Sequence, residues 1–252
     1  MNCLYTIICF TFGIVLGSFY NVVGYRLPQG KSLVKPRSEC PKCHKKLKWY
    51  ELIPVISFLI QRGKCNNCKC KISLFYPIIE ITTGILFALD FYLFGFSYKF
   101  IILLIVISLF NIVLVSDINF LIIPDEVTLV ATILVIITNL SFLELEKTIY
   151  MFFSGCLLFV IMYIVMILGN ILFKKESLGG ADIKLMILVG MILTPIDGIF
   201  CIFISSVLAL PISIFLLLKN KNNIIPYGPF ILGALLLILL CNIDVNTLLN
   251  LY

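Results

Sequence analysis

The sequence consists largely of long apolar runs separated by polar connections. As a helix, a run of about 20 apolar residues crosses the roughly 30 Å hydrocarbon core of a bilayer. The predicted spans are residues 4–24, 76–96, 98–116, 126–143, 149–173, 183–195, 198–218 and 228–241. With 61% hydrophobic and 13% charged residues, the chain has too much apolar surface to hide in one water-soluble core. We expect an all-α polytopic membrane protein with about eight transmembrane helices, the sixth and eighth being short.

The first apolar run is interpreted as a spanning helix and not as a signal peptide. No basic residue precedes Leu4, and the run continues through Gly17 and Ser18 without a small-x-small cleavage site. These two small residues permit close helix packing. Asn21, one turn further on, is a polar group that needs a partner in the bundle.

The Lys and Arg residues set the expected topology, because short cytoplasmic loops are enriched in them. Twelve of the 19 basic residues lie in residues 25–75. If the N-terminus is outside, this segment is cytoplasmic, and Lys99 and Lys147 are the only basic residues outside. The formal charge of +6 is then a topology signal and not a sign of nucleic-acid binding. We expect a multi-pass protein of the cell (plasma or inner) membrane, in contact with lipid, whose catalytic face is cytoplasmic.

Residues 30–75 form the one long polar loop, which is too small to fold on core burial alone. The loop contains Cys40 and Cys43, then Cys65 and Cys68, with 21 residues between the pairs. This is the two-knuckle pattern of a tetrahedral thiolate zinc site. Two disulfides are the alternative, but cytoplasmic thiols stay reduced. We expect a structural zinc ion on these four cysteines, with no open position for catalysis.

Other residues of the loop leave alternatives open. Cys70 and His44 could each substitute for a neighbouring ligand, although His44 directly follows Cys43 and is the poorer candidate. Residues 49–60 are apolar but too short to span, so we expect them on the membrane surface or against the bundle. The remaining cysteines lie in apolar runs and are expected to act as small hydrophobes; they are Cys3, Cys9, Cys156, Cys201 and Cys241.

Two aspartates stand at junctions between apolar runs and short connections. Asp117 closes the third predicted span, where the helix dipole disfavours a negative charge, and Asp182 opens the sixth after Gly179 and Gly180. An ordinary N-cap is the alternative role for Asp182, whereas Asp125 at the start of the fourth span is explained by capping alone. An acid within a membrane segment is costly and marks a functional site by default. Both acids fall at cytoplasmic helix ends, so they can face one another.

A facing aspartate pair suits peptide hydrolysis. Two close carboxyl groups tend to share one proton, so that one activates water while the other polarises the carbonyl. The only histidine, His44, belongs to the cysteine loop, which argues against a Ser-His or Cys-His hydrolase. A carboxylate-using transporter or channel and a zinc-dependent scaffold are the rival classes. Glu80, near the start of the second span, is a further candidate unless a basic residue such as Arg26 neutralises it.

The chain resembles the type IV prepilin peptidase family, bifunctional leader peptidases and N-methyltransferases with two aspartates of the GxGD type. The motifs that carry the resemblance are Gly17-Ser18-Phe19-Tyr20-Asn21-Val22 with Arg26-Leu27-Pro28, the two Cys-x-x-Cys pairs, Leu52-Ile53-Pro54 with Arg62-Gly63-Lys64-Cys65, Tyr76-Pro77 with Glu80, Asp117 with Pro124-Asp125, and Gly179 to Lys184. They cover nearly the whole chain.

The resemblance implies that Asp117 and Asp182 are the catalytic pair, which cuts a prepilin or pseudopilin after the glycine that ends its short basic leader. It also implies methylation of the new N-terminal residue with S-adenosylmethionine, at a site whose contacts the sequence does not assign. Residues 1–96 would form the N-terminal, methyltransferase region and residues 97–252 the peptidase domain. One position departs from the family pattern: Ala181 replaces the glycine before Asp182, and its methyl group is tolerable only with a negative φ.

Overall fold

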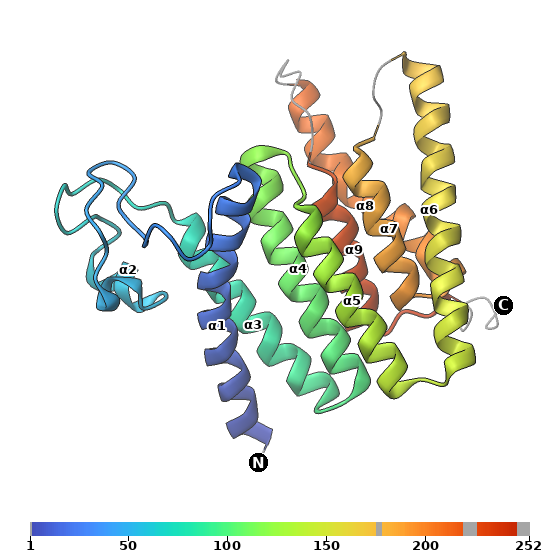
Figure 1. Ribbon diagram of the computed structural model, residues 1–252, viewed down its shortest axis with the longest axis horizontal. Helices are drawn as coiled ribbons and strands as arrows, with labels where there is room; N and C mark the ends of the chain where they lie inside the picture. The colour runs from blue at the N-terminus through green and yellow to red at the C-terminus, as the bar shows by residue number, and fades with distance from the viewer. Residues whose placement is uncertain (1, 175–177, 219–225, 246–252) are drawn as a thin grey trace. The chain divides into compact units, whose positions relative to one another are not determined.

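The computed structural model describes residues 2–174, 178–218 and 226–245 (Figure 1). In these ranges the regular elements are helices, and β pairing is limited to two isolated bridges, Glu39 with Lys46 and Lys64 with Lys71. By internal contacts the chain divides into two compact units, Met1–Gly95 and Phe96–Tyr252. The expected all-α polytopic architecture is confirmed.

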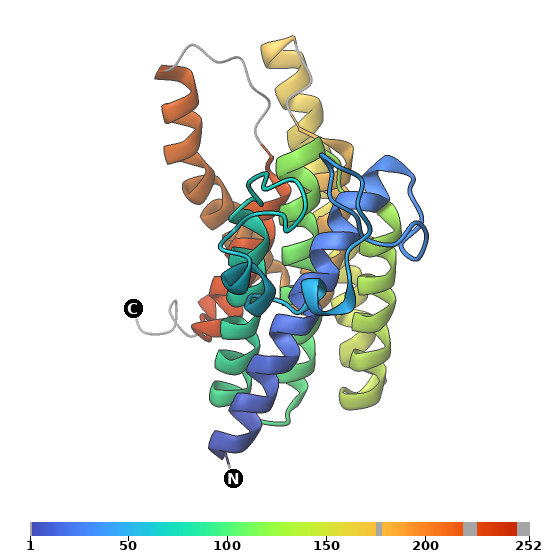
Figure 2. The same cartoon turned by 90° about the vertical axis from the view of Figure 1, so that its left-hand side faces the viewer.

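The first unit is a helix pair with the cysteine-rich loop between its members. Helices α1 (Asn2–Arg26) and α3 (Phe75–Phe94) pack along one another. Glycines allow this close approach, since a Cβ placed on Gly13 would lie 2.9 Å from the Gly84 Cα. The connecting loop holds the short elements η1 (Leu27–Gln29), η2 (Trp49–Leu52) and α2 (Ile56–Ile60). Figure 2 shows the loop beside the end of the pair that lies away from the N-terminus.

The second unit is a bundle of six helices. They are α4 (Tyr98–Phe120), α5 (Asp125–Phe142), α6 (Leu145–Phe173), α7 (Gly180–Ile192), α8 (Pro195–Leu218) and α9 (Gly228–Leu240). Helix α9 packs against α4, α7 and α8, and α7 also packs against α5 and α6 (Figure 1). Helix α9 therefore lies against both helices that carry the candidate aspartates.

Each predicted span corresponds to a helix, but two of these helices are short. In the described parts of the chain, six helices are long and apolar enough to cross a membrane: α1, α3, α4, α5, α6 and α8. Helices α7 and α9 have 13 residues each, and at about 1.5 Å per residue each is close to 20 Å long. These two helices are the ones that the sequence predicted to be short. The predicted count of about eight transmembrane helices is not confirmed, because six of the described helices are long enough to span.

Polar side chains join α7 to its neighbours inside the bundle. The Asn139 side chain of α5 donates to the Met191 carbonyl at 2.9 Å and accepts from the Tyr98 hydroxyl at 2.7 Å. On the other side, the Ser154 hydroxyl of α6 donates to the Leu193 carbonyl at 3.1 Å. Because hydrogen bonds have few competitors in an apolar interior, these contacts fix the position of α7.

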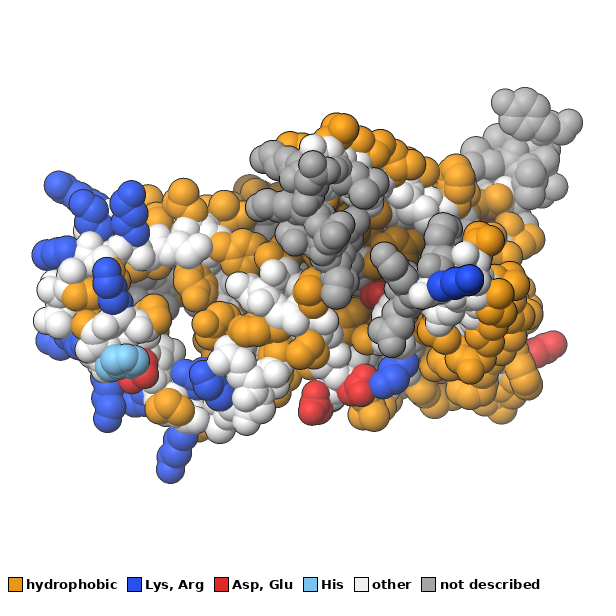
Figure 3. Space-filling model, turned by 90° about the horizontal axis from the view of Figure 1, so that it is seen from above, with side chains coloured by type: hydrophobic (Ala, Val, Ile, Leu, Met, Phe, Trp, Pro, Cys, Tyr) orange, Lys and Arg blue, Asp and Glu red, His pale blue; other side chains and the backbone are white. Residues whose placement is uncertain are grey.

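Charge is distributed unevenly over the surface. Figure 3 shows many Lys and Arg side chains gathered over the cysteine-rich loop, and apolar side chains over much of the six-helix bundle where its residues are described. Large apolar side chains along the spans are widely exposed, among them Phe12, Ile85, Leu129 and Phe203. An apolar girdle of this kind is expected where helices contact lipid.

Candidate active site and cysteine cluster

Asp117 lies in the last turn of α4 and is buried, with 5% of its surface exposed. The helix continues three residues beyond it and ends where Leu121 adopts a left-handed conformation, with the Leu121 N–H bonded to the Asp117 carbonyl at 2.9 Å. The Ser116 hydroxyl donates to the Ile122 carbonyl and closes the same turn. Local backbone geometry therefore fixes the position of Asp117.

Asp182 lies in the first turn of α7, and 8% of its surface is exposed. The N-cap is Gly179, whose N–H donates to the Asp182 carboxyl group. The N-cap role for Asp182 is thus wrong: the carboxyl reaches back to the cap residue, as the third residue of a capping box does. Ala181 is helical with a negative φ, so its methyl group causes no backbone strain, as the sequence argument required.

Gly228, the first residue of α9, contacts both acids. Its N–H donates to the Asp117 carboxyl group, and a Cβ placed on it would lie 3.3 Å from Asp182 Oδ1. The charge of Asp117 also acts on Asp182. The two carboxyl groups, 65 positions apart in the chain, are therefore neighbours at the N-terminus of α9.

The sequence interpretation did not include Gly228. A signal was present, because a Gly-Pro pair stands at the start of the last apolar run, at the end of the bundle where both aspartates were expected. The contact also explains how Asp117 is tolerated at a helix C-terminus. The positive end of the α9 dipole faces its carboxyl group and offsets the negative end of α4.

Asp125 and Lys184, which follow Asp117 and Asp182 closely in the sequence, form an ion pair with one another. The Lys184 Nζ lies 2.8 Å from the Asp125 carboxylate, and it does not pair with Asp182. Asp125 is the first residue of α5, with Pro124 as the N-cap. Both charged side chains are more than half exposed, so the pair contributes little to stability.

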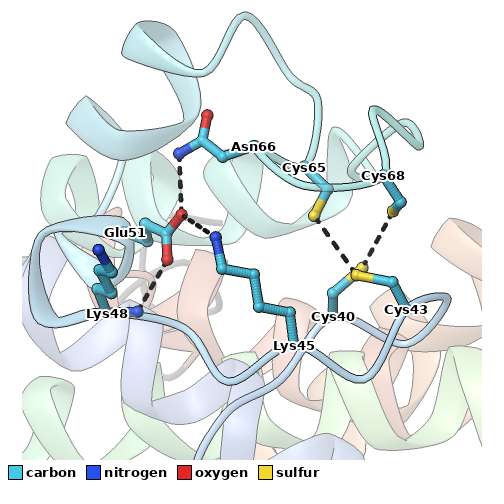
Figure 4. A network of polar contacts seen from close by, with 8 residues as sticks. All are labelled: Cys40, Cys43, Lys45, Lys48, Glu51, Cys65, Asn66 and Cys68. Carbon is cyan, nitrogen blue, oxygen red and sulfur yellow. Dashed lines mark hydrogen bonds and ion pairs between the residues drawn. The ribbon is translucent and has the colours of Figure 1, made fainter.

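The four predicted ligand cysteines come together. Their Sγ atoms all lie within 4.8 Å of one another, with 3.8 Å between Cys40 and Cys68 and 4.0 Å between Cys43 and Cys65 (Figure 4). A tetrahedron with Zn–S bonds of 2.3 Å has edges of about 3.8 Å. All ten cysteines of the chain are free thiols, so the disulfide alternative is wrong. The cluster fits a tetrahedral metal ion.

Backbone amides favour the thiolate form at two of the four cysteines. The N–H groups of Cys43 and Lys42 point at the Cys40 sulfur and lower the pKa of that thiol to about 6. The corresponding N–H groups of Cys68 and Asn67 lower the pKa of Cys65. The thiolate is the form that binds a metal, so these amides favour the ligand state of Cys40 and Cys65. At Cys68 the Cys70 side chain and burial raise the pKa of the thiol.

Of the two alternative ligands, only Cys70 lies in the cluster. Its Sγ is 3.2 Å from that of Cys68 and 3.6 Å from that of Cys40. The His44 ring is exposed and lies 3.3 Å from a Glu39 carboxylate oxygen. A fifth thiol thus stands beside a site that four thiolates complete.

Glu51 ties the two cysteine turns to the segment between them. Its buried carboxylate accepts the Lys48 N–H and the Asn66 side-chain N–H, both at 2.8 Å, with the Lys45 Nζ at 3.9 Å (Figure 4). The Lys48 N–H and then Asn66 lower the pKa of Glu51. This segment forms η2 and α2, whose large apolar side chains are widely exposed; its place on the membrane surface stays a prediction.

A second polar cluster lies between α1 and α3, at the end next to the loop. The Glu80 carboxylate accepts the Val55 N–H at 2.7 Å and a hydrogen bond from the Ser18 side chain. Arg26, considered as its partner, donates instead to the carbonyls of Ser32 and Leu33. Glu80 is therefore not neutralised by Arg26.

A groove opens on the loop beside α2. Its volume is about 490 Å³, within the range of small-molecule sites. The lining includes one aromatic and three basic residues; its members are Phe58, Arg62, Gly63, Lys64, Lys71, Ile72, Ser73 and Leu74. Gly63 has a φ of +65° and faces the Phe58 ring, which a Cβ would approach to 3.0 Å.

A helical bundle with two buried aspartates at a helix end is the arrangement expected of a membrane aspartic protease. Two family models match the chain: the bacterial peptidase A24 N-terminal domain at residues 11–94 and the type IV leader peptidase family at residues 102–214. The chain belongs to the type IV leader peptidase family.

Curated relatives agree with this assignment. A prepilin leader peptidase/N-methyltransferase of Bacillus subtilis is 36% identical over 192 residues, which cover 74% of this chain and 73% of the relative. Proteins with the same name in Vibrio cholerae and Neisseria gonorrhoeae are each 30% identical to this chain, and the alignments cover 97% and 84% of those relatives. The alignments span 94% and 86% of this chain. No solved structure matches the chain.

Proposed function

We propose that this chain is a membrane aspartic endopeptidase that removes the short leader of type IV prepilins or pseudopilins and then methylates the new N-terminal residue. Family membership supports both activities, since the relatives carry both in their names. The observation that carries the peptidase assignment is the meeting of Asp117 and Asp182 at Gly228.

The aspartate pair performs the hydrolysis. Two adjacent carboxyl groups in a buried site cannot both ionise cheaply, so they share one proton. The ionised acid takes a proton from the attacking water, and the protonated acid donates to the peptide carbonyl oxygen. One backbone N–H holds each carboxyl, from Gly228 for Asp117 and from Gly179 for Asp182. Such anchors keep both acids oriented before substrate arrives.

The cysteine cluster holds a structural Zn²⁺ on Cys40, Cys43, Cys65 and Cys68. The spacing of the sulfurs and the amides directed at Cys40 and Cys65 support this assignment. A site with four thiolates is closed, so the ion stabilises the loop and takes no part in hydrolysis.

The first unit supplies the methyltransferase activity. S-adenosylmethionine supplies a methyl group on a sulfonium sulfur. In the loop groove, Phe58 offers an aromatic face to such a cofactor and Arg62 offers a partner for its carboxylate. The further positive charges of Lys64 and Lys71 oppose its sulfonium and ammonium groups. Residues 1–96 would thus hold this activity and residues 97–252 the peptidase.

The proposed orientation places the loop and both aspartates on the cytoplasmic side, with the N-terminus outside. Twelve basic residues between positions 25 and 75 support it through the positive-inside rule. The basic leader of a prepilin would then meet the peptidase before export.

The test is cleavage of a prepilin by the purified full-length protein in detergent, followed by gel electrophoresis. Asp117→Asn and Asp182→Asn should each lower the rate by about 10²–10⁴-fold, the usual contribution of an acid–base group. Asp125→Asn is the matched control, since its exposed carboxylate starts the next helix, and it should cleave normally. Wild-type rates in either test variant would exclude that residue, and an inactive wild type would favour a transporter or scaffold.

A further inference from the structure

The seam between α1 and α3 contains two buried side chains with acceptor atoms, Glu80 and Asn21. Glu80 is 7% exposed and Asn21 is 3% exposed. Among the described residues, no Lys or Arg forms an ion pair with Glu80. Burying a carboxylate without a cationic partner is energetically costly. A buried acid of this kind therefore indicates a functional role.

Asn21 adds a second acceptor to the seam. Its Nδ2 donates to the Tyr76 carbonyl at 3.3 Å, and this bond fixes the orientation of the amide because two oxygens would repel. The Asn21 Oδ1 is then a buried acceptor for which the described residues provide no donor. Such orphaned groups are rare and each needs an explanation.

The two acceptors belong to one site. Ser18, which bonds to Glu80, lies one turn before Asn21 on α1, and Tyr76, which bonds to Asn21, lies one turn before Glu80 on α3. Nearby Thr83 gives its hydroxyl to the Ile79 carbonyl at 2.6 Å and supplies no donor to the seam. Ser18 and Val55 are partly exposed, and Tyr76 is 40% exposed, so the seam opens toward the loop.

The loop is strained where it closes on Glu80. Val55 has a φ of +60°, which is unusual for any residue with a Cβ and more so for a β-branched one. Strain of this kind persists where the surroundings hold it and clusters at ligand sites. Val55 is also the N-cap of α2, whose Phe58 lines the groove. The strained turn thus connects the acceptor seam to the proposed cofactor groove.

We propose that Glu80 and Asn21 bind an ammonium group. A protonated primary amine carries one positive charge and several N–H donors. The charge matches the Glu80 carboxylate, which has no cationic partner among the described residues, and a donor matches the free Asn21 amide oxygen. The inference rests on the proposed methyltransferase activity, whose two reactants each carry such a group. One source is the α-amine of the cleaved pilin, and the other is the α-amine of the methionine part of the cofactor.

The test compares wild type with Glu80→Gln in the full-length protein in detergent. Glutamine keeps an acceptor for the Val55 N–H but removes the charge. Asp90→Asn is the matched control, because Asp90 is a fully buried acid on the same helix, ten residues further on. Asn21→Val is a second variant that leaves Val55 untouched. Zinc content and the thermal unfolding temperature serve as folding checks and should match wild type in each variant.

Binding is measured by calorimetry with four probes, so that the readout does not depend on turnover. The probes are S-adenosylhomocysteine, 5′-methylthioadenosine, which lacks the amino-acid part, and a cleaved-pilin N-terminal peptide with a free or an acetylated amine. If the pilin amine binds here, Glu80→Gln should lower the affinity for the free-amine peptide at least tenfold and leave the affinity for both nucleosides unchanged. If the cofactor amine binds here, Glu80→Gln should lower the affinity for S-adenosylhomocysteine alone. Asn21→Val should act in the same direction and more weakly.

Unchanged affinity for all four probes in both variants would overturn the proposal. Equal weakening of the amine-bearing and amine-free probes, or equal weakening by Asp90→Asn, would also overturn it, because that pattern reports a general loss of packing. Failure of the proposed function is a separate result: wild type would then cleave prepilin yet transfer no labelled methyl group. The comparison of free and acetylated peptide still tests the ammonium site in that case.

Discussion

Replacement of Gly228 by alanine tests the geometry of the aspartate pair most directly. The new Cβ would lie 2.5 Å from Ile123 Cδ1, 3.3 Å from Asp182 Oδ1 and 3.3 Å from Val113 Cγ1. The φ of Gly228 is not positive, so alanine strains no backbone angle, and the effect of the substitution is steric.

The expected loss follows from the displacement that these contacts require. Carbon atoms pack at about 3.5–4.0 Å, so Ile123 Cδ1 and the new methyl group must separate by about 1 Å. Overpacking of this kind costs about 1–3 kcal/mol of stability. Part of the shift falls on the Gly228 N–H that holds Asp117 and on the carboxyl of Asp182. Because a 1 Å misplacement at a reacting centre can cost about 10²-fold, we expect cleavage to slow by about 10- to 100-fold.

The assay is the initial rate of prepilin cleavage, measured together with thermal unfolding in detergent. Gly233→Ala is the matched control on the same helix, since its Cβ would meet only Phe110 Cε2, at 3.8 Å. This control should cleave at the wild-type rate and unfold at the same or a slightly higher temperature. Wild-type cleavage by Gly228→Ala would refute the view that the start of α9 positions both acids.

Three further predictions concern the loop and the second aspartate. Cys40→Ser should lose the bound zinc and lower the melting temperature, whereas Cys70→Ser should keep one zinc per chain by elemental analysis; equal loss in both would make Cys70 a ligand. Glu51→Gln should lower the free energy of unfolding by about 1–2 kcal/mol at pH 7. Because the pKa of Glu51 is lowered in the folded protein, the difference in unfolding free energy between wild type and variant should be complete above about pH 4.3 and should become smaller as the pH falls further. A difference that does not change with pH in denaturant unfolding would contradict the charge argument. Ala181→Gly should retain cleavage while Ala181→Val slows it, and equal rates would remove the steric argument at this position.

Several parts of this protein could be predicted from the sequence because they depend on local chemistry. The apolar runs predicted where the helices lie, and the short sixth and eighth runs became the 13-residue helices α7 and α9. Cysteine spacing predicted the cluster, since a chelating turn needs only a few residues. The acid at each junction was visible because a charge in an apolar segment is expensive.

Other parts could not be predicted, because they depend on which helices touch. The sequence offered Arg26 or a lysine to neutralise Glu80, but the carboxylate bonds to the Val55 backbone and Ser18 instead. It also offered an N-cap role for Asp182, which the cap at Gly179 excludes. When several partners could bond to a polar group with similar strength, the three-dimensional packing around the group selects one of them.

The amino-acid sequence is enough to predict that this chain forms apolar helices and that two acids stand at their ends. That α9 packs against both α4 and α7, so that one glycine contacts both carboxyl groups, depends on contacts between distant segments. The physical reason is that hydrophobicity specifies which segments leave water, whereas helix partners in a bilayer are chosen by close packing and hydrogen bonds between residues far apart in the chain.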